Sequence, residues 1–394
     1  MKRIGIYGGT FNPPHLGHIR AAEYALKELS LDQLLLIPTC VSPHKQIPYG
    51  SPTPQQRLAM LQVAAGENPA ITVSGMELER GGASYTYETL EQLKRQYPDE
   101  ELVFLMGTDM FLSFESWRNP GRILELASLG VFCRGDKDEK LQIAHMQAHL
   151  EQRGGRVYVL ENPVTQISST QLRRLLVFRC AAPFLPDGVE AYIHREKLYG
   201  TDKDYRNLPM EQLEQTVVSL LDPNRVRHVL GCRDTAAQMA KVWGVDETDA
   251  ARAGLLHDIT KALDGPLQLT LCSEYDKVLG DFARKNPKTL HALTGSLVAE
   301  RIFGECQAVV DAIATHTTGA PNMNTLQKII YVADYMEPNR DFPGVEELRR
   351  LAYTDLDGAL KLGLEMTIEV LKQQGREISP ESAQALAYLN NLSR

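Results

Sequence analysis

The sequence predicts two domains of different class: an α/β domain with a doubly wound parallel sheet, followed by an all-helical domain. Short apolar runs that suit buried strands alternate with helical patterns through the first 200 residues. Beyond residue 210 these runs give way to apolar residues at helical spacing. We therefore expect an α/β domain at residues 1–200, a polar linker at 201–210 and a helical domain at 211–394.

The composition excludes several classes of protein. A chain of 394 residues is long enough for about two domains, and its net charge of −8 argues against a dedicated nucleic-acid binder. No apolar run reaches the roughly 18 residues of a membrane helix, and the chain begins with a strand pattern rather than a signal peptide. The six scattered cysteines contain no Cys-x-x-Cys pair, which is typical of reduced thiols. We expect a cytoplasmic protein without nucleic-acid or membrane partners; a homo-oligomer is left open.

The first strand leads into the most informative stretch of the chain. Residues 4–7 form an apolar run, Gly8 and Gly9 follow it, and His15 and His18 stand where a helical pattern begins. Ligands of open α/β sheets bind where strands give way to helices. A helix N-terminus also offers unpaired N–H groups and a partial positive charge to phosphate. Taken singly, each glycine or histidine also fits a tight turn or a surface position.

Later elements place further polar residues after strands. Lys45 follows the second strand and suits either a phosphate or a solvated loop, and Thr86 is the predicted N-cap of a helix. Asp109 follows the strand at 102–106, where a carboxylate binds ribose hydroxyls or structures the turn. The expected strands lie at 4–7, 34–37, 71–74, 102–106, 129–133 and 157–160, and helices are expected at 54–66 and 136–152.

Two further groups of residues in the first half suit the binding of a ligand. Trp117, beside Arg118, suits either the core or a stack against a flat ligand ring. Ser169 and Thr170 belong to a run of hydroxyl residues in which one residue is the predicted N-cap, and Arg173 is expected in the first helical turn. A cation there opposes the helix dipole unless an anion lies between them.

The string Gly-Gly-Thr-Phe-Asn-Pro-Pro-His-Leu-Gly-His at residues 8–18 resembles the signature of the nucleotidylyltransferase superfamily, in particular of bacterial nicotinate-nucleotide adenylyltransferases. Residues 167–173 match the Ile-Ser-Ser-Thr-x-x-Arg motif of that family. The resemblance implies a Rossmann-like fold and the reaction of ATP with nicotinate mononucleotide to give deamido-NAD and pyrophosphate, with Mg²⁺ accompanying ATP. An adenylyltransferase acting on phosphopantetheine is the alternative for this half.

The same resemblance implies roles for individual residues. Backbone N–H groups near Thr86 and Arg118 would bind the nicotinate carboxylate, Trp117 would stack on the pyridine ring, and Asp109 would bind substrate. His18 would stabilise the transition state. The residues implied to contact ATP are Gly8, Gly9, Thr10, Phe11, His15, His18, Lys45, Ser169, Thr170 and Arg173.

Histidines and aspartates recur in order through the second half. Imidazoles together with carboxylates suit iron, manganese or zinc, and a mixed set of this size suits a pair of ions. A carboxylate beside a histidine in an apolar stretch is costly to bury unless both are paired or bind a metal. Unrelated helix histidines are the alternative for any one of them. The candidate ligands are His228, His257, Asp258, His291, His316 and Asp334.

Three segments of the second half resemble the YqeK-type subgroup of the HD superfamily of metal-dependent phosphohydrolases. They are Leu-Leu-His-Asp-Ile-Thr-Lys, Thr-His-Thr-Thr-Gly and Tyr-Val-Ala-Asp-Tyr-Met-Glu-Pro-Asn-Arg. The resemblance implies symmetrical hydrolysis of diadenosine tetraphosphate to two ADP at two ions, iron or alternatively manganese. Lys261 and Arg340 would neutralise substrate phosphate, and a surface salt bridge is the alternative for Arg340. The implied ligands are His228, His257, Asp258 and Asp334 for one metal, and Asp258, His291 and His316 for the other.

Together the two halves predict a bifunctional enzyme that handles adenylyl phosphates at both sites. The alternative keeps the transferase and makes the helical half a regulatory nucleotide-binding module or a hydrolase of another nucleotide.

Overall fold

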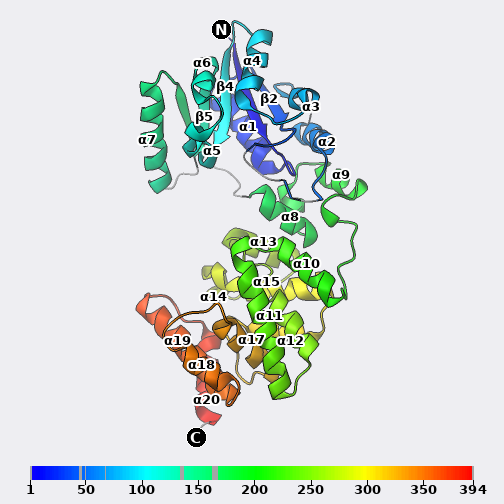
Figure 1. Ribbon diagram of the computed structural model, residues 1–394, viewed down its shortest axis with the longest axis vertical. Coiled ribbons are helices and arrows are strands. Elements are labelled where there is room, and N and C mark those ends of the chain that lie inside the picture. The colour runs from blue at the N-terminus through cyan, green and yellow to red at the C-terminus, as the bar shows by residue number, and fades with distance from the viewer. Residues whose placement is uncertain are drawn as a thin grey trace. The chain divides into compact units, whose positions relative to one another are not determined.

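The computed structural model describes residues 2–43, 47–48, 50–66, 68–133, 137–161 and 167–392, which fall into two units, Met1–Asp202 and Lys203–Arg394 (Figure 1). The first unit contains a sheet with helices on both faces, and the second is built from helices. This confirms the predicted fold class of each half.

Six parallel strands of the described residues form one sheet in the order β3-β2-β1-β4-β5-β6. The central strand β1 pairs with two neighbours, so that Ile6 lies beside Leu35 on one side and Phe104 on the other. The strands are β1 (Arg3–Gly9), β2 (Gln33–Pro38), β3 (Ile71–Val73), β4 (Glu101–Gly107), β5 (Ser128–Cys133) and β6 (Val157–Glu161).

Alternate strand residues bury the two faces of the sheet against different helices. Ile6 and Phe104 belong to a core that includes Leu90 of α4 and Ile143 of α7. Helix α1 buries Ala22 and contacts β1 and β2. The helices of this unit are α1 (Leu16–Glu28), α2 (Pro54–Ala65), α3 (Met76–Arg80), α4 (Thr86–Gln96), α5 (Thr108–Leu112), α6 (Pro120–Leu126), α7 (Lys137–Gln152), α8 (Ser169–Val177) and α9 (Val189–Arg195), with 3₁₀ turns η1 (Phe114–Ser116), η2 (Ala182–Phe184) and η3 (Leu198–Gly200).

The strand order reverses between β1 and β4, because β2 and β3 continue to one side of β1 while β5 and β6 continue beyond β4. In a parallel sheet this reversal opens a crevice at the carboxyl ends of the two strands. The loop after β1 and the start of α5 after β4 therefore meet at one edge of the sheet. One boundary differs from the prediction, since Gly8 and Gly9, which were expected to follow the strand, are the last residues of β1.

The second unit contains no strand among its described residues, as predicted. Helix α11 packs against α12 and α17, and α16 packs against α12, α15 and α17. None of the described helices combines the length and apolarity that crossing a bilayer requires. The helices are α10 (Met210–Leu220), α11 (Pro223–Trp243), α12 (Glu247–Leu256), α13 (Gly265–Glu274), α14 (Asp281–Lys285), α15 (Leu290–Val298), α16 (Gln307–Thr315), α17 (Thr325–Met336), α18 (Val345–Ala352), α19 (Leu356–Gln373) and α20 (Pro380–Leu392), with turns η4 (Pro287–Thr289) and η5 (Ala299–Phe303).

The segment expected as a linker contacts the second unit. Tyr205 is buried, and its ring centroid lies 6.2 Å from that of Phe303. The backbone N–H of Asn207 donates to the carbonyl oxygen of Phe303 at 2.9 Å. The polar stretch before α10 is therefore attached to the helical unit by an aromatic contact and a backbone hydrogen bond.

Candidate functional site

A buried arginine fixes the loop that follows β1. Phe11 is buried against Gly9, where a side chain would meet the Phe11 ring at 3.3 Å. Arg57 of α2 is fully buried, and its guanidinium donates to the carbonyl oxygens of Thr10 at 2.6 Å and Thr39 at 2.7 Å. These carbonyls directly follow β1 and β2, so Arg57 ties together two loops at the carboxyl edge of the sheet.

His15 and His18 stand at the start of α1, behind this loop. His15 is the N-cap residue, and its backbone N–H donates to Nδ1 of His18 at 3.2 Å. A neutral His18 therefore carries its ring proton on Nε2. The two rings stack with their centroids 3.6 Å apart. Burial lowers the pKa of His15 to about 4, so its imidazole is neutral near pH 7. Ring N–H donors at the positive end of a helix dipole suit phosphate oxygens.

The start of α8 lies against the same loop. The hydroxyl of Ser169 donates to the carbonyl oxygen of Pro13 at 3.1 Å, and Nη1 of Arg173 donates to that of Asn12 at 2.7 Å. Nη2 of Arg173 donates to the hydroxyl of Thr170 at 3.0 Å. The structure thus brings together the two sequence motifs expected to bind ATP, although they are more than 150 residues apart.

Two helix starts differ from the prediction. Tyr85, with φ −89° and ψ 126°, is the N-cap of α4, and Thr86 is already its first helical residue, so the predicted N-cap at Thr86 is wrong. Ser168 is the N-cap of α8, as one of the hydroxyl residues was predicted to be. Arg173 consequently lies in the second turn instead of the first. The dipole effect fades within one turn, so Arg173 does not oppose it strongly.

The residues expected around a pyridine ring lie together only in part. The Arg118 guanidinium lies 4.5 Å from the centroid of the Tyr85 ring, which places Arg118 beside the turn that precedes Thr86. Trp117 is only 8% exposed and packs against core aromatic rings, the alternative that its sequence position allowed. Asp109 is exposed in the first turn of α5, directly after β4.

Several polar residues that hold this site were not selected from the sequence. Tyr199 donates from its hydroxyl to Oδ1 of Asn12 at 2.8 Å, and Nδ2 of Asn12 donates to the Ser51 hydroxyl at 3.0 Å. Of the residues that were not selected, Arg57 alone could have been noticed in the sequence, because it is a charged residue within the apolar stretch of a predicted helix. Lys45, expected at the triphosphate, lies outside the described residues.

In the second unit, all six candidate metal ligands converge on one cluster. Three of the four histidines and Asp258 are more than 95% buried, and the Asp334 side chain is 19% exposed. His228 lies on α11, His257 and Asp258 at the end of α12, His291 on α15, His316 at the end of α16 and Asp334 on α17.

Asp258 lies at the centre of this cluster. Its Oδ2 atom is 3.6 Å from Nε2 of His228 and 3.5 Å from Nε2 of His257. Its Oδ1 atom is 3.5 Å from Nε2 of His291 and 3.8 Å from Nε2 of His316. Each carboxylate oxygen therefore faces its own pair of imidazoles, which is the arrangement of a carboxylate that bridges two ions.

Asp334 adds a second carboxylate on one side only. Its Oδ1 atom lies 3.1 Å from Nε2 of His228 and 3.8 Å from Nε2 of His257. The ligand atoms of these three residues lie within 4.8 Å of one another, as do those of His257, Asp258 and His316. Position A is defined here by His228, His257, Asp334 and Oδ2 of Asp258, and position B by His291, His316 and Oδ1 of Asp258.

Each imidazole is oriented from outside the cluster through its Nδ1 atom. The Nδ1 atoms of His257, His291 and His316 lie 2.7, 2.9 and 2.7 Å from the backbone oxygens of Gly254, Lys288 and Ile313. Nδ1 of His228 instead lies 3.1 Å from Oε1 of Glu337. Because Nδ1 then carries the proton, the lone pair of Nε2 points into the cluster, as metal-binding histidines require.

The protonation states also suit a metal. Burial lowers the pKa of His316 to about 4 and holds the pKa of His257 well below its usual value. Burial tends to raise the pKa of Asp334, but its contact with His228, the nearby histidines and Arg340 hold it well below the usual range. Neutral imidazoles and ionised carboxylates are the forms that bind metal ions. This donor set fits divalent iron, manganese or zinc.

Three basic side chains border the cluster. Arg225 of α11 contacts the shared carboxylate, and Arg340 donates from Nη2 to Oδ1 of Asp334 at 2.7 Å. Nζ of Lys261 lies 2.9 Å from Nε2 of His291, and burial lowers the pKa of Lys261 to about 8. Lys261 and Arg340 were selected from the sequence, whereas Arg225 was not. Such cations suit the phosphates of a nucleotide.

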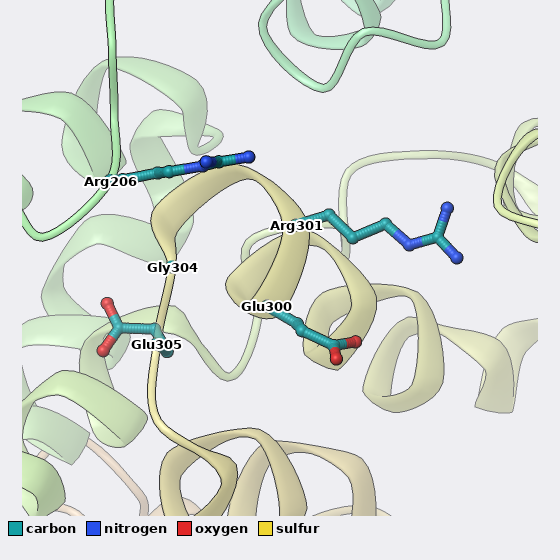
Figure 2. Close-up of a pocket in the computed structure, with 5 residues that line it drawn as sticks. All are labelled: Arg206, Glu300, Arg301, Gly304 and Glu305. Atoms are coloured by element: carbon teal, nitrogen blue, oxygen red, sulfur yellow. The ribbon is translucent and has the colours of Figure 1, made fainter.

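A separate pocket in the second unit has a volume of about 600 Å³ and contains none of these residues among its described lining. Figure 2 shows Arg206 lying across the turn that ends at Gly304. Arg301 donates to the backbone oxygen of Tyr275 at 2.8 Å, and Glu305 accepts two hydrogen bonds from Arg252. Two of its charged side chains are thus already hydrogen-bonded, and its described lining includes no residue of either candidate site. Its lining residues are Arg206, Glu300, Arg301, Gly304 and Glu305.

Comparisons with known proteins assign each half separately. Residues 6–175 match the cytidylyltransferase-like family, and residues 225–339 match the HD domain family. A "probable nicotinate-nucleotide adenylyltransferase" of Thermomicrobium roseum is 41% identical over 204 residues, which cover 51% of this chain and 93% of that protein. A protein of the same description from Syntrophotalea carbinolica is 37% identical over 214 residues, covering 50% of this chain and 97% of that protein.

For the second half, a crystal structure of a predicted HD superfamily hydrolase involved in NAD metabolism from Clostridium acetobutylicum is 36% identical. The match covers 47% of this chain and 98% of that one, with a TM-score of 0.46. The chain thus belongs to the nicotinate-nucleotide adenylyltransferase family through its first half and carries an HD domain in its second.

Proposed function

We propose that the first unit transfers the adenylyl group of ATP to nicotinate mononucleotide, giving deamido-NAD and pyrophosphate. Relatives described as probable nicotinate-nucleotide adenylyltransferases match this whole unit. The observation that carries the proposal is the contact between the loop after β1 and the start of α8, at the edge where the strand order reverses. His18, Arg173 and the N-terminus of α1 meet there, and all three suit the phosphates of ATP.

The proposed reaction needs little covalent chemistry from the protein. The phosphate of the mononucleotide is already a nucleophile, so it attacks the α-phosphorus of ATP without a general base, and pyrophosphate leaves. Catalysis then depends on positioning and on neutralising charge. His18 donates from Nε2 to phosphate oxygens, and Arg173 holds the triphosphate. Mg²⁺ arrives with ATP and neutralises its phosphates, and Lys45 is expected to assist.

For the acceptor, we propose that Arg118 and the turn before Thr86 bind the nicotinate carboxylate. The guanidinium of Arg118 lies over Tyr85 and beside this turn, which supports an anionic aromatic substrate. Stacking of Trp117 on the pyridine ring is kept as a prediction. It requires the ring, 8% exposed here, to become more exposed when substrate binds.

A substrate panel tests this half. Nicotinate mononucleotide, nicotinamide mononucleotide and phosphopantetheine are each supplied with Mg-ATP, and pyrophosphate release is followed. We expect the nicotinate compound to be preferred and His18→Ala to lose at least about 100-fold in rate, the usual size of a lost charge-stabilising donor. His149→Ala, which changes a half-exposed histidine of α7, is the matched control. Preference for phosphopantetheine would replace the proposed substrate.

We further propose that the second unit hydrolyses diadenosine tetraphosphate to two ADP, using iron or manganese ions held at positions A and B. The observation that carries this proposal is Asp258, each of whose oxygens faces two imidazole nitrogens. When bound, such a pair of ions supplies Lewis acidity and lowers the pKa of a water molecule. The chain itself orients the ligands, and Lys261 and Arg340 bind phosphate oxygens of the substrate. A cytoplasmic location is part of this proposal.

One contact favours a second candidate function. Arg225 contacts the shared carboxylate and would compete with a metal for it, which suits a regulatory module that binds nucleotide with little turnover. Incubating iron- or manganese-loaded protein with a series of diadenosine polyphosphates separates the two. We expect ADP as the sole product from the tetraphosphate and no product from His257→Ala. Binding without cleavage by the metal-loaded wild type would favour the module.

A further inference from the structure

We propose that Glu337 is a positioning residue that makes position A the stronger of the two metal positions, so that A retains its ion when B releases it. This inference rests on the metal centre of the proposed function. It concerns a residue outside the six candidate ligands, three positions beyond Asp334 at the end of α17. At this spacing the two carboxylates leave the same side of the helix end.

Glu337 is held rigidly against one histidine. It is 1% exposed, and its Oε1 atom lies 3.1 Å from Nδ1 of His228. Its Oε2 atom accepts hydrogen bonds from the backbone N–H and from Nδ2 of Asn339, both at 2.8 Å. Both carboxylate oxygens are therefore occupied, and the orientation of the His228 ring is fixed from behind.

A carboxylate partner changes the chemistry of the imidazole that it contacts. A charged acceptor polarises Nδ1–H more strongly than a neutral one, which makes the opposite nitrogen more basic and a better metal ligand. The other three cluster histidines direct Nδ1 toward backbone carbonyl oxygens. Position A alone therefore contains an imidazole strengthened by a carboxylate among the described residues.

The two positions also differ in their own donors. Position A has two imidazoles, Asp334 and one oxygen of Asp258, whereas position B has two imidazoles and the other oxygen of Asp258. Having fewer donors makes B the weaker position.

Protein groups near position B reduce the cost of losing its ion. The Thr317 hydroxyl lies 3.0 Å from Nε2 of His291 and 3.1 Å from Nε2 of His316. Nζ of Lys261 lies 2.9 Å from Nε2 of His291. These groups can satisfy the imidazole nitrogens of B when no ion is bound, and Arg225 and Arg340 can do the same for the carboxylate oxygens of A. The expected order, release from B before release from A, therefore rests on the number of donors and on the contact of Glu337 with His228.

Titration of the metal-free full-length protein with Mn²⁺ tests the proposal. Calorimetry measures the two binding steps, and the electron paramagnetic resonance signal of free Mn²⁺ gives the bound fraction. We expect Glu337→Gln to weaken the tighter step by roughly 10- to 100-fold and to change the weaker step by less than about threefold. His291→Ala should remove only the weaker step, which assigns that step to position B.

Glu305→Gln is the matched control, because it removes another buried carboxylate, paired with Arg252, that is not placed in the metal centre. It should leave both binding steps unchanged. If Glu337→Gln does not fold, Asn339→Ala replaces it, since loosening Glu337 should weaken the same step to a smaller extent. Equal effects on both steps, or an effect on neither, would overturn the proposal. Absence of Mn²⁺ binding by the wild type would instead contradict the proposed metal centre.

Discussion

Replacing Arg57 by lysine tests whether this buried arginine holds the loop after β1 in the shape that binds ATP. The guanidinium spans two loops by donating to the carbonyl oxygens of Thr10 at 2.6 Å and Thr39 at 2.7 Å. A lysine ammonium is a point charge on a different stem, so it loses at least one of these bonds. A hydrogen bond from a charged donor contributes about 1.5–3 kcal/mol. If the loop must regain its shape to bind ATP, kcat/KM of the transferase falls by roughly 10- to 150-fold.

The assay compares both activities of one preparation. Arg57→Lys should lower transferase kcat/KM for ATP while hydrolysis of diadenosine tetraphosphate stays within about twofold of wild type, because the two sites belong to separate units with their own internal contacts. Arg95→Lys, which changes an exposed arginine of α4, is the control for the substitution itself. A variant with wild-type transferase activity would refute the role of Arg57 in shaping the loop after β1, and equal loss of both activities would indicate general misfolding.

Three further predictions follow from the same geometry. Asp258→Asn should bind at most one metal ion per chain by elemental analysis and lose at least about 100-fold of any hydrolase activity, since an amide offers one ligand oxygen where the carboxylate offers two; two retained ions would contradict the bridging role. Tyr199→Phe removes the hydrogen bond to Asn12, worth about 0.5–1.5 kcal/mol, and should lower transferase kcat/KM by roughly 2- to 12-fold, whereas Tyr192→Phe should not. The His15 ring should stay neutral down to about pH 5 in an NMR titration, because burial lowers its pKa to about 4. Since this pKa lies below the ordinary value of about 6.5, the stability that the neutral ring contributes is complete above about pH 6.5 and declines as the pH falls toward 4. A titration midpoint near 6.5 would contradict the burial.

The elements that follow from local pattern could be predicted from the sequence. Apolar runs such as 34–37 and 102–106 lie within β2 and β4, and the helical stretch at 54–66 corresponds to α2. Boundaries were less predictable, because they depend on which residue first adopts helical backbone angles. The N-cap at Tyr85 instead of Thr86 is an example, since no side chain caps that helix and the favoured residue type carries no information there.

The candidate sites show a similar division. The His-Asp pair stood out because polar residues interrupt an apolar stretch, so the metal ligands could be proposed from the ordered series of histidines and aspartates, and their division between two ions from the family resemblance. Glu337 could not, because its role depends on a contact with a histidine 109 residues earlier in the chain. Arg57 likewise acts through carbonyl oxygens, which carry no side-chain signal. Trp117 allowed two interpretations; it packs against core rings in this structure, and its stacking on a substrate ring stays a prediction.

The most direct test of the central claim, that one chain carries two independent active sites, is a reciprocal inactivation. Both activities are measured on single preparations of the full-length wild type, His18→Ala and Asp258→Asn, with iron or manganese and Mg-ATP supplied. We predict that His18→Ala loses formation of deamido-NAD but still converts diadenosine tetraphosphate to ADP, and that Asp258→Asn shows the opposite loss. A wild type that lacks either activity, or a variant that loses both, would contradict it.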